Sequence, residues 1–314
     1  MTNYPQGQGF EIRAMRPEEA DKVAGLIYES TNHWYEAHGH SRIFKGKWKD
    51  CRIFTDVYGD IDPGRCLIAV SGEDTILGSC FYHPRETHVS LGIMNAHPAI
   101  GRKGVAKALL MAIIDIAKDM DLPLRLVSST FNLDSYSLYT RQGLAPFAFY
   151  QDVMIKVPVE GIAIDEVPGI SIRNARAGDE DQIDALERQI WQTSRKSDWA
   201  YFINNEREIW HSTVAEDASG TIVGALVSVA HPGSNMLGPG LAQTPEVAKA
   251  MIQTELNHHK GQSPVFLLPA NNRELVASMY ALGARNCELH VGQVLGDAPE
   301  IKGIVMPTFM PETA

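Results

Sequence analysis

The sequence predicts a mixed α/β fold that occurs twice along the chain, and three pairs of similar segments support this prediction. The members of each pair follow the same order and lie about one domain length apart: 12–16 with 172–176, 75–78 with 221–224, and 138–143 with 278–283. Each segment of the first pair reads as a short strand and a polar turn before an amphipathic helix. Three such pairs indicate a duplicated fold.

Within the first copy, strand and helix patterns alternate. The expected elements are strands at 65–70, 76–82 and 87–96, a helix at 104–118, a strand at 124–129, a helix at 135–142 and a strand at 147–157. The helix at 104–118 carries Val105, Leu109 and Ile113 on one face, and Gly143 is a natural end for the helix before it. This alternation indicates a mixed sheet with helices packed on it.

A segment with prolines and glycines near its two ends separates the copies. It runs from Val157 to Gly169 and includes Pro158, Gly161 and Pro168. We therefore predict a first domain at 1–157, a linker at 158–170 and a second domain at 171–314. Each half is long enough to bury a core of its own.

The composition excludes several classes of protein. The formal net charge of −10 argues against a broad nucleic-acid surface, which needs a basic face. The four cysteines form no CxxC pair, so we expect free thiols rather than a zinc site or a disulfide framework. The sequence has no signal-peptide pattern and no apolar run near the ~20 residues that span a bilayer. We expect a cytoplasmic protein without a membrane or nucleic-acid partner.

The segment from His97 to Lys107 lies between an apolar strand and the helix at 104–118. A turn here places unpaired backbone N–H groups and the positive end of a helix dipole at one point, which suits an anion. Arg102 and Lys103 add positive charge. From the glycine spacing alone, an ordinary strand-to-helix turn with solvated basic residues is favoured. The order of strand, glycine-basic turn and helix shifts the prediction toward phosphate binding.

This turn resembles the acetyl-CoA diphosphate loop of the GNAT superfamily of N-acetyltransferases. The family pattern is Gln/Arg-x-x-Gly-x-Gly/Ala, and residues 101–106 read Gly-Arg-Lys-Gly-Val-Ala, which departs from it only at Gly101. The resemblance implies two tandem acetyl-CoA N-acyltransferase-like domains, with acetyl-CoA as co-substrate and no metal. It implies cofactor contacts at Met94, Asn95, Ala96, Gly101, Arg102, Lys103, Gly104, Val105, Ala106, Lys107 and Asn132.

The resemblance also implies roles in the reaction. In the family, the backbone of the strand before the loop pairs with the pantetheine arm and polarises the thioester carbonyl; here Gly92 would tolerate a bulge in that strand. Asn132, Tyr139 and Gly143 match the family's next landmarks, and the tyrosine often protonates the departing CoA thiolate. The alternative for Tyr139 is an aromatic on the buried face of a helix. The spacing of the three residues favours the catalytic role.

A general base must take a proton from the acceptor ammonium. Alternation along a strand would place Glu86, His88 and Ser90 on one side, and His88 has the suitable unperturbed pKa of ~6.5. His88 is our candidate, directly or through water, with a structural histidine as an equal alternative. The family varies here, so the resemblance assigns no base.

The acceptor site in this family usually lies near the first two helices. Residues 33–40 interleave aromatic side chains and histidines with Glu36, which suits a pocket for an amine. An ordinary helix end explains the pattern equally well. The three histidines His33, His38 and His40 lack a companion ligand pair, so we expect no metal. We expect a small-molecule or peptide amine as acceptor, and allow for a homodimer.

The second copy departs from the family. We expect its counterpart of the phosphate turn near 237–243, which has no basic residue and includes Pro239. Met279 stands where the first copy has Tyr139. We therefore expect this half to have lost acetyl-CoA binding.

These observations predict an N-acetyltransferase that moves an acetyl group from acetyl-CoA to a primary amine by direct attack, with the N-terminal half active. One alternative is a non-catalytic acyl-CoA-binding sensor or interaction module. Another is a nucleotide or dinucleotide enzyme, but the chain lacks the GxGxxG and GxxxxGK[ST] signatures.

Overall fold

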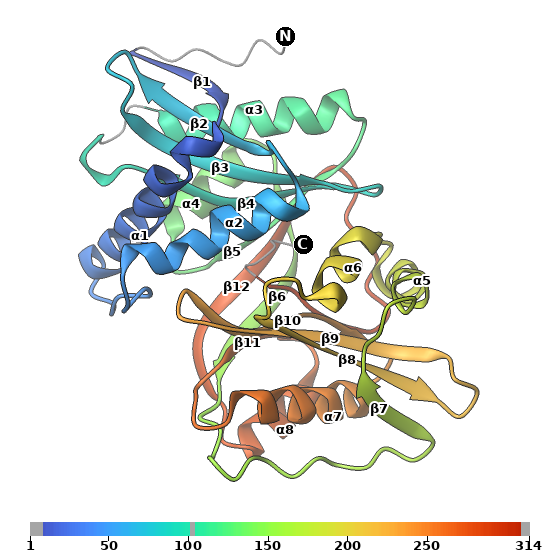
Figure 1. The fold of residues 1–314 in the computed structure, drawn as a ribbon. Helices are drawn as coiled ribbons and strands as arrows, with labels where there is room; N and C mark the ends of the chain where they lie inside the picture. The colour runs from blue at the N-terminus through green and yellow to red at the C-terminus, as the bar shows by residue number, and fades with distance from the viewer. Residues whose placement is uncertain (1–8, 101–103, 309–314) are drawn as a thin grey trace. The chain divides into compact units, whose positions relative to one another are not determined.

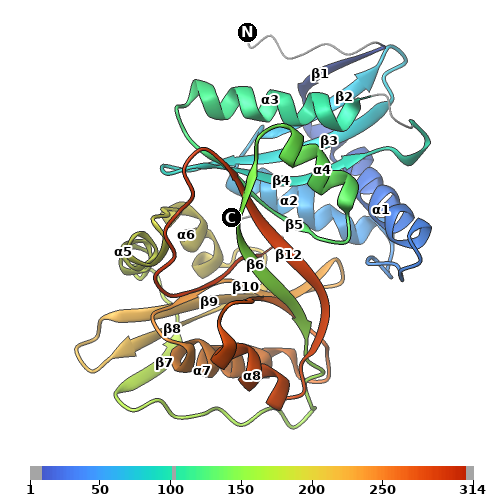
Figure 2. The ribbon, with the colours of Figure 1, turned by 180° about the vertical axis from the view of Figure 1, so that it is seen from behind.

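The computed structural model describes residues 9–100 and 104–308, and it divides into two compact units (Figures 1 and 2). In the described chain, the first unit comprises 9–84, 88–100 and 104–124, and the second comprises 85–87 and 125–308. Gly101, Arg102 and Lys103 lie outside the described residues.

The first unit is an antiparallel sheet with helices on both faces. Its strands pair in chain order and comprise β1 (Phe10–Ala14), β2 (Cys66–Ser71), β3 (Ile76–Pro84) and β4 (Val89–Ala96). Its helices comprise α1 (Ala20–Ala37), α2 (Arg52–Ile61) and α3 (Val105–Asp119), with short 3₁₀ turns at Pro17–Glu19, Trp48–Cys51 and Pro98–Ile100. In Figure 1, α3 lies across one face of the sheet and α1 and α2 lie on the other. Because both faces are covered, β2 is buried along almost its whole length.

The second unit holds the other strands. Their order is β5 (Leu124–Ser129), β12 (Arg285–Leu295), β6 (Ala145–Met154), β11 (Val265–Pro269), β10 (Ser234–Ala242), β9 (Ile222–His231), β8 (Trp210–Asp217) and β7 (Ile170–Asn174), with β13 (Ile304–Met306) paired to β10. The helices are α4 (Leu133–Arg141), α5 (Glu180–Trp191), α6 (Lys196–Asn204), α7 (Pro245–Leu256) and α8 (Arg273–Ala281), with a 3₁₀ turn at Asn257–His259. A core of buried side chains from β6, β9, β10 and β11 packs under α7 and α8.

The two sequence copies exchange their last long strands. Strand β6 ends the N-terminal copy, yet it pairs with β11 and β12 of the C-terminal copy. Strand β12 lies between β5 and β6, and both figures show β6 and β12 side by side. The predicted domain boundaries follow the sequence repeat, whereas the two compact units follow this exchange, so the boundaries at 157 and 171 stay a prediction.

The repeat is visible in side-chain contacts. Arg13 donates two hydrogen bonds to Glu19, at 2.8 and 2.7 Å, and Arg173 donates two to Asp179, at 2.7 and 2.9 Å. Each carboxylate also accepts a 2.8 Å bond from a backbone N–H three residues before it. The first pair of similar segments therefore encodes a clamp between a strand and the start of the next helix.

The predicted elements agree with the structure except near their ends. Strand β4 begins at Val89 rather than at 87, and β6 ends at Met154 rather than at 157. Helix α4 begins at Leu133, two residues early, because Asn132 caps it. Among the described helices, none combines the length and apolar character that crossing a bilayer requires.

Candidate active site

Strand β4 carries a bulge where the sequence predicts one. Cys80 pairs with Met94 and Tyr82 with Leu91, so β4 has one extra residue at 92–93. A Cβ on Gly92 would lie 2.7 Å from His83 Nε2, so the bulge requires glycine. A bulge leaves backbone groups out of the ladder, which frees them for a ligand.

Met94, Asn95 and Ala96 follow the bulge to the end of β4. Met94 and Asn95 are half-buried, and Ala96 is exposed. The Asn95 side chain donates to Ser30 Oγ at 2.7 Å and to Thr31 Oγ1 at 3.2 Å, which ties β4 to α1. The sequence indicated only a backbone contact of Asn95 with the cofactor. It did not indicate this link, because a single polar residue in a strand carries no signal for a partner in a distant helix.

The N-terminus of α3 has no side-chain cap. Gly104 precedes the helix in the left-handed region, with φ of 79°, which favours glycine. No acidic residue occupies the first turn, and Ala108 N donates to Gly104 O at 2.9 Å to close it. The N–H groups of Val105, Ala106 and Lys107 precede this first intrahelical bond, and the helix dipole adds positive potential there.

In the C-terminal copy, the expectation that 237–243 replaces the phosphate turn is wrong, because 237–242 belong to strand β10. Their pairing with β9 matches the pairing of 91–96 with β3, including a bulge at 238–239. The glycines that suggested a turn therefore serve a bulge and a close approach: a Cβ on Gly240 would lie 2.4 Å from Leu226 Cδ1.

Two glycines fix the correspondence between α3 and α7. A Cβ on Gly78 would lie 2.6 Å from Val105 Cγ1, and a Cβ on Gly224 would lie 3.0 Å from Val247 Cγ1. Each helix rests on the glycine of the strand beneath it, so Val105 and Val247 are equivalent positions.

The connection that enters the helix differs in length between the copies. The N–H groups of His97 and Gln243 donate to the neighbouring strand, at 2.8 and 3.0 Å, and mark the same point in each copy. Seven residues, 98–104, then lead to Val105, whereas three residues, 244–246, lead to the equivalent point of α7. The turn of the C-terminal copy is therefore four residues shorter.

Helix α7 satisfies its own N-terminus. Thr244 Oγ1 accepts a 3.3 Å hydrogen bond from Val247 N, and Pro245 at the first helical position has no N–H to offer. Hydrogen bonds from the Thr244 side chain and from its own backbone N–H lower the pKa of Glu246. This helix end thus holds a carboxylate of the chain itself.

Helices α4 and α8 begin and end alike. Asn132 Oδ1 accepts from Ser135 N at 2.9 Å, and Asn272 Oδ1 accepts from Leu275 N at 2.9 Å. The glycines that follow these helices, Gly143 and Gly283, both have φ of 93°. In both copies the asparagine is a helix cap, and cofactor contact by Asn132 stays a prediction.

His88 lies immediately before β4 and is 1% exposed. Ser90 is also buried, whereas Glu86 is exposed and accepts a 2.6 Å bond from Arg188, which lowers the pKa of Glu86. The strand begins only at Val89, so strand alternation does not align Glu86 with the other two. The role of His88 as a base stays a prediction.

Two sequence-family models match the chain. The model described as acetyltransferase (GNAT) family covers 27–144, and the model described as acetyltransferase (GNAT) domain covers 199–298. The chain belongs to the GNAT family. It is an acyltransferase with two GNAT domains in tandem, and both domains take part in a mixed α/β architecture. No curated protein matches the chain.

Solved structures share the tandem GNAT fold across the whole chain. A putative acetyltransferase from Pyrococcus horikoshii is 15% identical, with 99% of each chain covered and a TM-score of 0.76. A GCN5-related N-acetyltransferase from Sphaerobacter thermophilus is 16% identical, with 93% of this chain and 97% of that chain covered and a TM-score of 0.63. A tandem GNAT protein from the clavulanic acid biosynthesis pathway is 14% identical, with 91% and 98% covered and a TM-score of 0.61.

In this GNAT protein, the segment expected to line the acceptor site is the C-terminal end of α1. The Trp34 ring stacks on His38 at 4.2 Å, with His40 at 6.5 Å. Glu36 accepts a 2.7 Å bond from Arg42, which lowers the pKa of Glu36. The Glu36 carboxylate is therefore already paired with Arg42 and is not freely available to a cationic acceptor. The role of the segment in amine binding stays a prediction.

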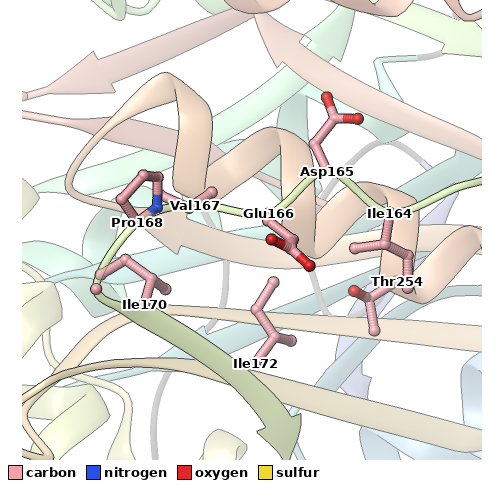
Figure 3. Close-up of a pocket in the computed structure, with 9 residues that line it drawn as sticks. Ile164, Asp165, Glu166, Val167, Pro168, Ile170, Ile172 and Thr254 are labelled. Carbon is pink, nitrogen blue, oxygen red and sulfur yellow. The ribbon is translucent and has the colours of Figure 1, made fainter.

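A hollow of about 680 Å³ lies between the linker and α7 in the tandem GNAT structure, in the second unit. Figure 3 shows its lining, which comprises 164–170, Ile172 and Thr254. Asn257 holds the linker by accepting from Ile162 N at 2.8 Å and donating to Ile162 O at 2.9 Å. None of the predicted site residues lines this hollow, so it is not a candidate active site.

Proposed function

We propose that this acyltransferase moves an acetyl group from acetyl-CoA to a primary amine, and that the N-terminal copy carries the reaction. The observation that supports it is the contrast between two helix ends. The N-terminus of α3 has no side-chain cap and no acid in its first turn, whereas that of α7 has Thr244, Pro245 and Glu246. Only the first offers free donors to an anion.

The diphosphate of acetyl-CoA binds at the N-terminus of α3. The N–H groups of Val105, Ala106 and Lys107 donate to its oxygens, and Arg102 and Lys103, which precede the helix in the sequence, add charge. The pantetheine arm then follows the backbone of 94–96, which comes directly after the bulge at 92–93.

The acceptor nitrogen attacks the thioester carbon, a C–N bond forms, and the C–S bond breaks as the CoA thiolate leaves. Tyr139 gives its hydroxyl proton to that thiolate; the pKa values of ~10 for a phenol and ~8.5 for a thiol are close enough for a shared proton. His88, directly or through water, takes the proton that the acceptor ammonium must lose before attack. The second proton, which the nitrogen loses as the amide forms, passes through water and restores the hydroxyl of Tyr139.

The test is a panel of primary amines, comprising amino acids, polyamines, aminosugars and peptides, incubated with acetyl-CoA and the full-length protein. Release of free CoA thiol together with an acetylated product is the expected result. Binding of acetyl-CoA without transfer to any amine would instead indicate a non-catalytic acyl-CoA-binding module.

A further inference from the structure

Three side chains that can bind a metal meet on one face of strands β6 and β12. Asp152 on β6 lies opposite Glu288 on β12, and His290 stands two residues beyond Glu288 on the same face. One donor atom from each residue lies within 4.8 Å of the others. All three residues belong to the second unit, so the cluster is defined within one compact body.

The cluster is buried, but its groups do not satisfy one another. Asp152, Glu288 and His290 are 9%, 6% and 3% exposed. His290 Nδ1 lies 4.0 Å from Asp152 Oδ2, and His290 Nε2 lies 3.9 Å from Glu288 Oε1, both beyond hydrogen-bond distance. Within the described chain, the buried Oδ1 atom of Asp152 has no hydrogen-bond partner.

Asp152 also lacks a basic partner. Among the described residues, neither an arginine nor a lysine forms an ion pair with it, and the imidazole of His290 is the nearest basic group. A buried carboxylate without a cation is strongly unfavourable. A proton or a bound cation at Asp152 would remove this cost.

We propose that Asp152, Glu288 and His290 form a binding site for a divalent transition-metal ion, with Zn²⁺ as the best match. One imidazole and two carboxylates are a mixed N/O donor set, and three protein ligands leave an open position for water or another ligand. Ligands at ~2.1 Å from such an ion lie about 3.0 to 3.4 Å apart. The three donor atoms, one from each residue, lie within 4.8 Å of one another, so side-chain shifts of about 1 Å bring them onto one ion.

This site is separate from the residues proposed for acetyl transfer, and it departs from the sequence-based expectation of no metal. The sequence carries no signal for it, because Asp152 and Glu288 are brought together only by the exchange of β6 and β12.

The test uses the full-length protein stripped with a chelator and then titrated with ZnCl₂, followed by calorimetry and thermal melting. At zinc one hundred times its Kd, we expect the Tm to rise by roughly 5 to 10 °C. Asp152→Asn and His290→Gln remove this rise. The exposed-histidine variant His38→Gln retains it. Replacement of Zn²⁺ by Co²⁺ gives a visible d–d spectrum in the wild type and in His38→Gln, but not in Asp152→Asn or His290→Gln.

The variants are chosen so that misfolding cannot imitate loss of the site. Asp152→Asn is isosteric and removes a buried charge, so its metal-free Tm stays equal to that of the wild type or increases. Absence of a zinc-dependent rise in the wild type would overturn the proposal, as would an equal rise in Asp152→Asn. A rise with Mg²⁺ or Ca²⁺ but not with Zn²⁺ or Co²⁺ would overturn the assignment to a transition metal.

Discussion

At the level of single residues, the clearest difference between the copies is a hydroxyl group. Tyr139 and Met279 each stand seven residues after the capping asparagine and four before the left-handed glycine. Both side chains are buried, at 6% and 0% exposed. The fold therefore requires an apolar side chain at this position, and methionine satisfies it. Tyr139 adds a hydroxyl group at this buried position, which the proposed proton donor needs.

We expect Tyr139→Phe to lower kcat by roughly a hundredfold while the Kd for acetyl-CoA stays unchanged, because it removes one proton donor and no packing. Steady-state kinetics with an accepted amine and calorimetry with acetyl-CoA measure the two quantities. Tyr280→Phe is the matched control, since its exposed hydroxyl donates to Gln151 Oε1 at 3.0 Å. Unchanged turnover in Tyr139→Phe would remove this residue from the mechanism.

Gly92 is the residue on which the β4 bulge depends. We expect Gly92→Ala to destabilise the protein by about 1 to 3 kcal/mol, because its Cβ would meet His83 Nε2 at 2.7 Å and Phe81 Cβ at 3.1 Å. Urea unfolding measures this loss. Gly59→Ala in α2 has nothing within 4 Å of its new Cβ and should instead raise stability by roughly 0.5 to 1 kcal/mol. Equal effects of the two substitutions would show that the close approach at the bulge is unimportant.

At the level of elements, the starts of α3 and α7 differ, and this difference supports the proposed diphosphate site at α3. Both helices rest on a glycine of their strand, at Gly78 and Gly224, so the packing is shared. Of these two helices, only α3 has the longer connection and lacks a side-chain cap.

Ala106→Glu places a carboxylate on the second residue of α3, as Glu246 is the second residue of α7. We expect it to weaken acetyl-CoA binding by at least roughly tenfold relative to the equally long Ala106→Gln, because a negative charge then faces the diphosphate. The free protein should be as stable or slightly more stable, since an acid suits a helix N-terminus. Calorimetry and thermal melting measure these opposite effects; equal affinities in the two variants would contradict a diphosphate at this helix end.

The helices and strands of the N-terminal copy could be predicted from the sequence. A glycine-containing strand of the C-terminal copy, however, was predicted to be a turn. Hydrophobic periodicity gave the helix at 104–118 and the strand at 124–129 almost to the residue. The glycines at 238 and 240 suggested a phosphate turn, yet they serve a bulged strand and a close approach to Leu226. Glycine spacing alone does not distinguish backbone that approaches a ligand from backbone that approaches a neighbouring strand.

At the level of the whole molecule, the exchange of β6 and β12 pairs strands of the two sequence copies within the second compact unit. Strand β6 pairs with two strands of the C-terminal copy, and β12 continues the ladder toward β5. The C-terminal copy thus supplies strand partners for β5 and β6 of the N-terminal copy.

We expect a fragment of residues 1–157 to be unstable alone, because β5 and β6 would lack the strand between them and expose unpaired edges. Size-exclusion chromatography should show aggregation or self-association. Co-expression with a fragment of 158–314 should restore a soluble one-to-one complex. A monomeric 1–157 fragment with a cooperative unfolding transition would contradict this dependence.

The exchange also marks the limit of sequence-based prediction here. The repeat predicted two copies, and both family models and the clamps at Arg13 and Arg173 agree with it. Nothing in the sequence predicted which copy each final strand would join, because strand pairing is decided by non-local packing rather than by local pattern. The Asp152, Glu288 and His290 cluster was invisible for the same reason.

The central claim is that one of two similar domains holds the diphosphate of acetyl-CoA. Calorimetric titration of the full-length protein with acetyl-CoA tests it most directly, because the stoichiometry counts the sites. The account predicts one site per chain. Two sites per chain, or no binding at all, would contradict it.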